Sequence, residues 1–330
     1  MEYRTLGNTD VKVTPIAFGA WAIGGAMWGG AEKKDAVEAI KRSVDHGITT
    51  IDTAPVYGYG KSEELVGEAV RGMRDKVQIL TKYGLRWDAK KGQYYFSLKD
   101  ENGNNIDIYR YAGKESVIKE CENSLKRLGT DHIDLYQIHW DDPTTPVEET
   151  MEAINILLEQ GKIRAAGVCN YNVDLLKEAL KTAPICSVQV PYSMVHRDIE
   201  DDLVPYCIGN RKSILAYSPM QRGLLTGKFS PDHEFNDGDT RAGSPYFKSE
   251  NIKKTNLFLE DIKPIADAKG ASLAQLVIRW TLEQPGITVA LVGARDTKQV
   301  DENVGAMNIN LSKDETEQIN SKLNQLNLNL

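Results

Sequence analysis

The sequence has few cysteines and no long apolar stretch. It contains four cysteines in 330 residues, at positions 121, 169, 186 and 207, and no two of them form a C-x-x-C pair. This spacing argues against a zinc motif built on paired cysteines and is typical of a protein from a reducing compartment. No run approaches the roughly 18 apolar residues of a transmembrane helix, and residues 1–7 lack the apolar core of a secretory signal. We therefore expect a cytoplasmic protein without a membrane partner.

An excess of basic residues is also missing. Lys and Arg number 40 against 47 Asp and Glu, which gives a formal net charge of −7 at pH 7. A nucleic-acid surface needs a clustered basic face, so this balance argues against a nucleic-acid partner. The oligomeric state does not follow from the sequence.

Two common nucleotide-binding motifs are absent as well. No G-x-G-x-x-G pattern follows a predicted strand, which disfavours a Rossmann domain. Gly60-Lys61-Ser62 is similar to the end of a phosphate-binding P-loop, but that motif requires glycine at position 55, where Pro55 stands.

Apolar strand patterns and amphipathic helical patterns alternate along the chain. The expected strands are 16–19, 48–52, 77–82, 133–138, 164–168, 187–190, 213–217 and 288–292. The expected helices are 33–46, 62–71, 114–128, 146–160, 173–181, 198–210, 257–269, 273–283, 297–306 and a last one from Ser312. Eight β-then-α units favour a closed (β/α)8 TIM barrel over an open parallel sheet. We expect one domain over residues 1–330, opened by a β-hairpin at 3–13.

Two connections are too long to be simple turns. Residues 83–113 are rich in aromatic residues, and residues 219–256 contain several glycines and arginines. Both follow strands, so both are expected on the face where the strands end. Long loops at that face commonly cover or select ligands.

Four chemically active side chains follow three successive strands. Asp52 ends one strand, Tyr57 lies on the loop after it, Lys82 ends the next strand, and His139 follows a third. The carboxyl ends of the strands form the active-site face of a (β/α)8 barrel. The sequence therefore predicts a catalytic site made of these four residues.

This order of residues resembles the aldo-keto reductase family, whose tetrad is one Asp, one Tyr, one Lys and one His. The resemblance covers essentially the whole chain and implies reduction of a small-molecule aldehyde or ketone by a nicotinamide cofactor. It implies that Tyr57 donates the proton and that His139 orients the substrate oxygen. A free phenol has a pKa near 10, so we expect the Lys82 ammonium, paired with Asp52, to lower the pKa of Tyr57.

The resemblance also implies a set of cofactor-binding residues. Asn170 and Gln189 would hold the carboxamide, Tyr217 would stack on the nicotinamide, and Arg295 would bind an adenosine 2′-phosphate. The whole expected set is Trp21, Cys169, Asn170, Gln189, Tyr217, Ser218, Pro219, Gln221, Arg222, Gly293, Arg295, Gln299, Glu302 and Asn303. Cys169 stands where the family commonly has Ser, and Gln299 where some members have Arg. NADP(H) is the expected cofactor, with NAD(H) second.

The expected substrate contacts are aromatic, and two rival functions stay open. Trp21, Trp87 and Trp140 are expected to line the mouth of the site, with Tyr57 inside it. An accessory protein of the same fold, similar to channel-associated β subunits, would keep the tetrad and use bound cofactor as a signal. A metal-dependent lyase or hydrolase using Asp52 and His139 is disfavoured, because metal sites need three or four converging ligands. No metal site is expected.

Overall fold

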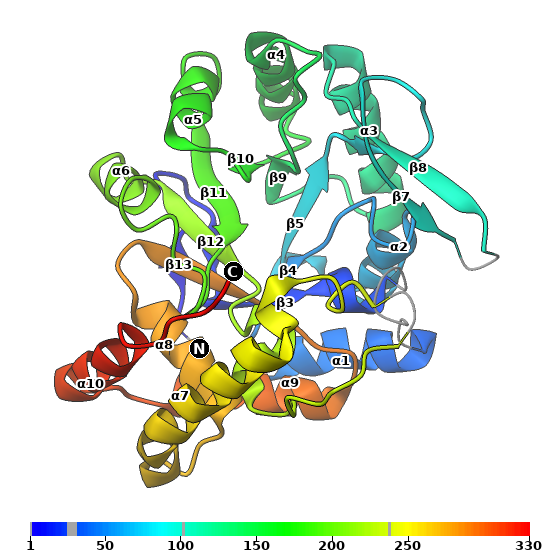
Figure 1. Cartoon of the computed structure of the whole chain (residues 1–330). Helices are drawn as coiled ribbons and strands as arrows, with labels where there is room; N and C mark the ends of the chain where they lie inside the picture. Colours follow the sequence, from blue (N-terminus) through cyan, green and yellow to red (C-terminus); the bar gives the residue numbers. More distant parts are fainter. Residues whose placement is uncertain (1, 25–31, 101–102, 237–238) are drawn as a thin grey trace.

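Eight parallel strands close into a barrel in the computed structural model, which describes residues 2–24, 32–100, 103–236 and 239–330 (Figure 1). The barrel strands are β3 (Ile16–Gly19), β4 (Thr50–Asp52), β5 (Gln78–Tyr83), β9 (Leu135–Ile138), β10 (Ala166–Cys169), β11 (Ile185–Pro191), β12 (Ser213–Tyr217) and β13 (Ile287–Gly293). They neighbour one another in chain order, and β13 pairs with β3 to close the ring. The expected (β/α)8 barrel is confirmed.

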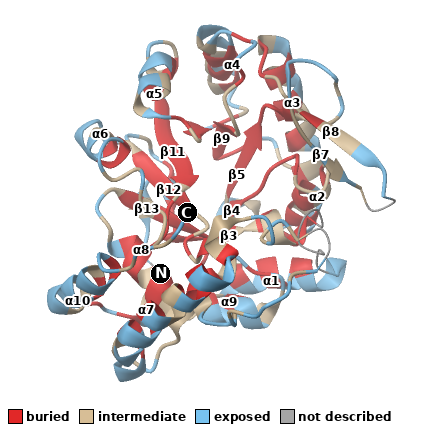
Figure 2. Cartoon of the chain, viewed as in Figure 1, coloured by how far each residue is buried: buried red, intermediate tan, exposed pale blue. Residues whose placement is uncertain are grey.

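Helices surround the barrel with their apolar sides inward, and Figure 2 shows buried strands inside outward-facing exposed helix surfaces. The α-helices are α1 (Lys33–Asp45), α2 (Lys61–Ala69), α3 (Lys114–Leu128), α4 (Val147–Glu159), α5 (Val173–Leu180), α6 (Leu203–Gly209), α7 (Ser249–Ala268), α8 (Leu273–Glu283), α9 (Thr297–Val304) and α10 (Lys313–Leu323). The short 3-10 helices are η1 (Ala20–Ile23), η2 (Arg74–Lys76), η3 (Gln221–Thr226), η4 (Pro245–Phe247) and η5 (Gly305–Asn308). Local signals set several ends: Ser312 and Glu315 form the capping box expected for α10, and Gly129 (φ 64°) ends α3.

An N-terminal hairpin closes one end of the barrel. Its strands, β1 (Arg4–Thr5) and β2 (Lys12–Val13), pair antiparallel. Leu6, Val11 and Val13 of this hairpin are fully buried, and they belong to the same apolar cluster as the inward-facing Leu80 and Leu135. Apolar side chains of the hairpin therefore cover the barrel interior at the N-terminal ends of the strands. The carboxyl ends of the strands remain available for a site.

The first long connection contains a small sheet that the sequence analysis treated as a loop. Strands β6 (Leu85–Arg86), β7 (Gln93–Lys99) and β8 (Asn105–Arg110) form an antiparallel sheet in the order β6-β8-β7. Their aromatic and β-branched residues favour extended structure. The predicted β-then-α alternation did not include these strands, because their sheet is an insertion outside the barrel pattern.

Two helix boundaries also differ from expectation. Helix α7 begins at Ser249, eight residues earlier than position 257, and includes Pro264 inside it. Helix α6 begins at Leu203, after a turn, with Asp202 as its N-cap. Both differences lie on the outside of the barrel and leave the strand ends in place.

Candidate active site

A cavity of about 620 Å³ lies at the carboxyl ends of the barrel strands. Tyr57 and His139, which are suited to proton transfer, line one part of it, and Arg295 and Gln299 line another. Proton-transfer groups and a cation therefore face the same cavity. Of the residues assigned to the site from sequence, all line this cavity except Lys82, Cys169, Gln221 and Trp87.

Lys82 and Asp52 form a buried ion pair behind the cavity wall. Their strands β5 and β4 are neighbours, and Lys82 Nζ lies 2.7 Å from Asp52 Oδ1. The ammonium also donates to the Thr53 carbonyl oxygen at 2.9 Å. Burial opposes the charge on Lys82, but attraction from Asp52 and then Tyr57 outweighs it and raises the pKa of Lys82. Lys82 is therefore a fixed positive charge at neutral pH.

Gln189 is hydrogen-bonded to the second carboxylate oxygen of Asp52. Its Nε2 donates to Asp52 Oδ2 at 2.9 Å. Since the amide nitrogen faces Asp52, the amide oxygen is the part of Gln189 suited to accept from a carboxamide in the cavity. This contact was not foreseen from sequence, because β11 and β4 do not pair and are brought together only across the closed barrel.

Tyr57 lies on the loop after β4, with Lys82 Nζ 5.0 Å from the centroid of its ring. The next residue, Gly58, has φ 63°, and a Cβ there would lie 1.8 Å from the Gly24 carbonyl oxygen. Only glycine fits this close approach, which holds the Tyr57 loop against the end of η1.

Lys82 lowers the pKa of Tyr57, as expected, but the net shift of that pKa has the opposite sign. Burial raises the pKa of Tyr57 to about 12, and the opposing effect of Lys82 is smaller. The phenol is therefore protonated at neutral pH. This is the form that a proton donor needs.

His139 presents a neutral imidazole beside Tyr57. The two rings lie 5.7 Å apart, edge to face. Burial, assisted by the charge on Lys82, holds the pKa of His139 well below its usual value. Its Nδ1 is buried and has no hydrogen-bond partner among the described residues. A neutral imidazole can still donate one hydrogen bond to a substrate oxygen.

Asn170 links the ends of three strands. Its Nδ2 donates to the His139 carbonyl oxygen at 3.0 Å, and its Oδ1 accepts from the Tyr217 hydroxyl at 2.9 Å. Asn170 has φ 59°, a conformation that Asn tolerates better than most residues. The contacts orient the Tyr217 ring at the edge of the cavity.

The far part of the cavity is built by the turn from β13 into α9. Asp296 caps α9, accepting from the Gln299 backbone N–H at 2.8 Å, and Gln299 Oε1 accepts from the Arg295 backbone N–H at 3.0 Å. Asn303 Nδ2 donates to the Gly293 carbonyl oxygen at 3.2 Å. Glu302 accepts from the Ser272 hydroxyl. A cation beside a helix N-terminus suits a phosphate-bearing ligand.

Four assigned residues lie outside the lining. Lys82 lies behind the cavity wall. Cys169 is buried, and burial raises the pKa of its thiol. Gln221 is buried and accepts from the Ser193 hydroxyl at 3.0 Å. The Trp87 ring packs 6.0 Å from the ring of Tyr59.

From the two long connections, Pro219 and Arg222 line the cavity as expected, and several further lining residues from these connections had not been assigned to the site. They include Tyr95, Phe96, Leu98, Phe229 and Arg241. The aromatic content of residues 83–113 was the available signal, but the added sheet decides which of those aromatics face inward.

Two features of the described residues concern metal binding and membrane insertion. Within that part of the chain, no group of three or more His, Cys, Asp or Glu side chains could hold a metal ion. Among the described helices, none is long and apolar enough to cross a membrane.

Comparisons with known proteins agree with this geometry. Residues 15–324 match the Aldo/keto reductase family. An aldo-keto reductase of Bacillus subtilis is 40% identical over 304 residues, covering 91% of this chain and 87% of that protein. An NADH-specific methylglyoxal reductase of Escherichia coli is 36% identical over 318 residues, covering 94% and 95%.

A solved structure, of a glycerol dehydrogenase from Gluconobacter oxydans, superposes with a TM-score of 0.89. It is 35% identical, and the match covers 98% of this chain and 95% of that one. The fold, the family match and the relatives favour an enzyme over an accessory protein. The chain belongs to the aldo/keto reductase family and is an oxidoreductase of the kind that reduces carbonyl groups.

Proposed function

We propose that this protein reduces small aldehydes or ketones to alcohols with NADPH and that Tyr57 is the proton donor. The observation that carries the proposal is the buried Lys82–Asp52 pair behind Tyr57, in a cavity that also reaches Arg295. We also propose that residues 1–330 act as one domain, since the elements pack around one barrel.

A nicotinamide cofactor held in the cavity would supply the hydride for the carbonyl carbon. Tyr57 gives its phenolic proton to the carbonyl oxygen, because its pKa keeps it protonated. The phenolate that develops is stabilised by the nearby Lys82 ammonium, and Asp52 holds that ammonium in place. The neutral His139 ring donates a hydrogen bond that orients the same oxygen.

The residues that would hold the cofactor divide into two groups. Asn170, Gln189 and Tyr217 would hold the nicotinamide end, since Gln189 donates to Asp52 and Asn170 joins Tyr217 to the His139 carbonyl oxygen. Arg295, at the start of the turn into α9, would bind the 2′-phosphate. The remaining members of the proposed set, all of which line the cavity, are Trp21, Ser218, Pro219, Arg222, Gly293, Gln299, Glu302 and Asn303.

NADH is the second candidate cofactor. The Escherichia coli relative is NADH-specific by name, at 36% identity. In this chain, Asp296 follows Arg295 directly, and a carboxylate near a 2′-phosphate would weaken its binding. Arg295 favours NADPH, and Asp296 opposes it.

Steady-state turnover with both cofactors tests the proposal. Methylglyoxal and an aromatic aldehyde should each be reduced over many turnovers with NADPH, with a higher kcat/KM than with NADH. A higher kcat/KM with NADH would overturn the cofactor assignment alone. A single slow turnover with either cofactor would instead indicate a nucleotide-sensing protein.

A further inference from the structure

Strand β7 has one more residue than its partner strand β8 over the same stretch of pairing. Tyr94 pairs with Tyr109, and the next pair is Phe96 with Ile108, so Tyr95 is an extra residue in a β-bulge. A bulge leaves one residue outside the regular ladder and redirects its side chain.

The bulge places two neighbouring aromatic rings on the cavity side of the sheet. In a regular strand, successive side chains point to opposite faces. Here Phe96 and Leu98 line the cavity as alternation requires, and Tyr95 lines it as well. Tyr94 points away and is 53% exposed. The sheet therefore adds an aromatic residue to the wall that regular pairing would not supply.

Tyr95 is held in that position from several sides. Its ring centroid lies 5.5 Å from that of Trp140 and 4.9 Å from that of Phe96. The Arg110 guanidinium carbon lies 5.1 Å from the centroid of the Tyr95 ring. Tyr95 and Trp140 line the same cavity as Tyr57 and His139, so the Tyr95 ring is part of the wall around the place where a substrate would bind.

We propose that Tyr95 determines substrate specificity and that it favours carbonyl compounds whose carbonyl carbon carries a flat apolar group. This inference rests on the proposed function of the same site. Such a group would stack against the Tyr95 ring and contact the apolar wall formed by Val56, Leu85, Phe96 and Leu98. A small dicarbonyl would reach Tyr57 and His139 without touching Tyr95.

The test compares two aromatic residues that are adjacent in sequence and face opposite ways. For Tyr95→Ala, kcat/KM for 2-naphthaldehyde should fall roughly tenfold, about 1.4 kcal/mol, from lost stacking and apolar contact. The kcat/KM for methylglyoxal should change less than twofold. The control Tyr94→Ala should leave both values unchanged. Deletion of Tyr95, which restores regular pairing of β7 with β8, should reproduce the Tyr95→Ala result with the sheet intact.

Binding of the product alcohol separates this inference from the proposed function. Calorimetry should show that Tyr95→Ala weakens 2-naphthalenemethanol about tenfold in the presence of the cofactor and that Tyr94→Ala does not. Wild-type protein that turns over neither aldehyde would refute the proposed function, while the binding comparison would still judge Tyr95. Equal losses for both aldehydes, or unchanged alcohol affinity, would refute the role of Tyr95.

Discussion

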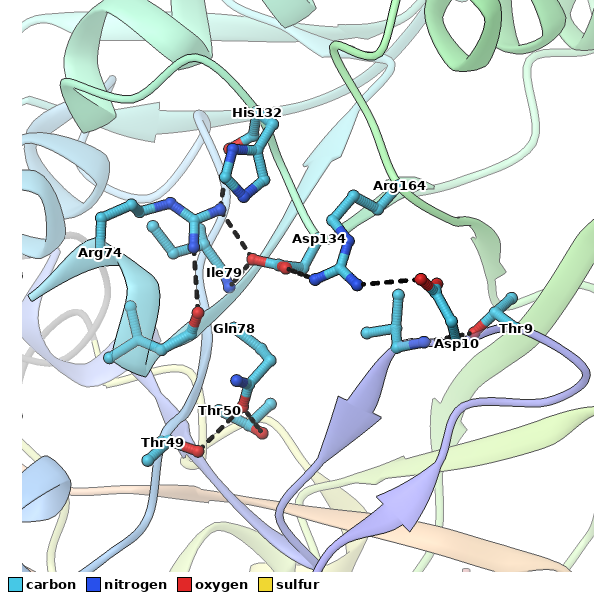
Figure 3. A network of polar contacts seen from close by, with 12 residues as sticks. Thr9, Asp10, Thr49, Thr50, Arg74, Gln78, Ile79, His132, Asp134 and Arg164 are labelled. Atoms are coloured by element: carbon cyan, nitrogen blue, oxygen red, sulfur yellow. Dashed lines mark hydrogen bonds and ion pairs between the residues drawn. The ribbon is translucent and has the colours of Figure 1, made fainter.

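The two ends of the barrel each contain a buried carboxylate, and they use it differently. At the N-terminal end, Asp134 accepts from Arg74 Nη2 at 2.7 Å, the Ile79 backbone N–H at 2.9 Å and Arg164 Nη1 at 2.9 Å (Figure 3). At the C-terminal end, Asp52 accepts from Lys82 Nζ at 2.7 Å and from Gln189 Nε2 at 2.9 Å, and it lines the cavity.

The partners explain the difference. Arg74 is itself fixed by bonds to the carbonyl oxygens of Val77 and His132, so the Asp134 network ties strand starts together (Figure 3). Lys82 instead lies beside the Tyr57 ring. We therefore expect one buried charge pair to stabilise the fold and the other to set the charge around the proposed proton donor, Tyr57. Variants at each end of the barrel should separate these two roles.

Removing the cation at the catalytic end should have the largest effect. Lys82→Met leaves Asp52 buried without its cation, and breaking such a pair costs about 3–5 kcal/mol of folding free energy. It should also lower kcat by roughly 10²–10⁴, because the developing phenolate loses its counter-charge. Urea denaturation and steady-state kinetics measure the two effects. A folded variant with near wild-type kcat would show that Lys82 has only a structural role.

The matching change at the other end should affect stability alone. Asp134→Asn leaves Arg74 and Arg164 facing a neutral amide, and the free energy of unfolding should fall by about 3 kcal/mol. Because Asp134 is remote from the cavity lining, kcat should stay within about twofold of wild type. A large loss of kcat with unchanged stability would contradict the division between the two ends.

Within the catalytic end, cofactor choice should be separable from chemistry. Arg295→Ala should weaken NADPH about tenfold, about 1.4 kcal/mol, and leave NADH almost unaffected. Quenching of tryptophan fluorescence gives both dissociation constants, and Lys313→Ala on α10 is an exposed control. If both cofactors are weakened equally, Arg295 holds the adenine or the turn, and the proposed NADPH preference has another source.

The smallest expected effect is the pH dependence of reduction. A Tyr57 pKa of about 12 keeps the donor protonated, and the lowered pKa of His139 keeps it neutral, so kcat for reduction should vary less than about twofold from pH 6 to 9. Alcohol oxidation needs the phenolate, so its rate should rise by about tenfold per pH unit over the same range. A reduction rate that falls tenfold per unit above pH 8 would place the donor pKa far lower.

The barrel and the tetrad were predictable from sequence because both depend on local order. Each strand is followed by a helix, and Asp52, Lys82 and His139 each end or follow a strand. Placing them on one face needs only the rule that parallel strands end together. The N-terminal hairpin was predictable for a similar reason.

Quantities that depend on tertiary burial were not predictable. The sign of the Tyr57 pKa shift follows from desolvation by surrounding elements, which a list of neighbouring charges does not contain. The Gln189–Asp52 bond joins residues 137 positions apart. The inward orientation of Tyr95 depends on a single extra residue in β7. The alternation of apolar and polar residues in the sequence does not reveal such a bulge.

The most direct test of the account is Tyr57→Phe, which removes one hydroxyl from the cavity wall. We expect kcat for carbonyl reduction to fall by roughly 10²–10⁴, the usual contribution of a general acid. The NADPH dissociation constant should stay within about twofold, because the phenol does not hold the adenosine end. Retention of more than about half of the wild-type kcat in this variant would contradict the assignment of Tyr57 as the proton donor.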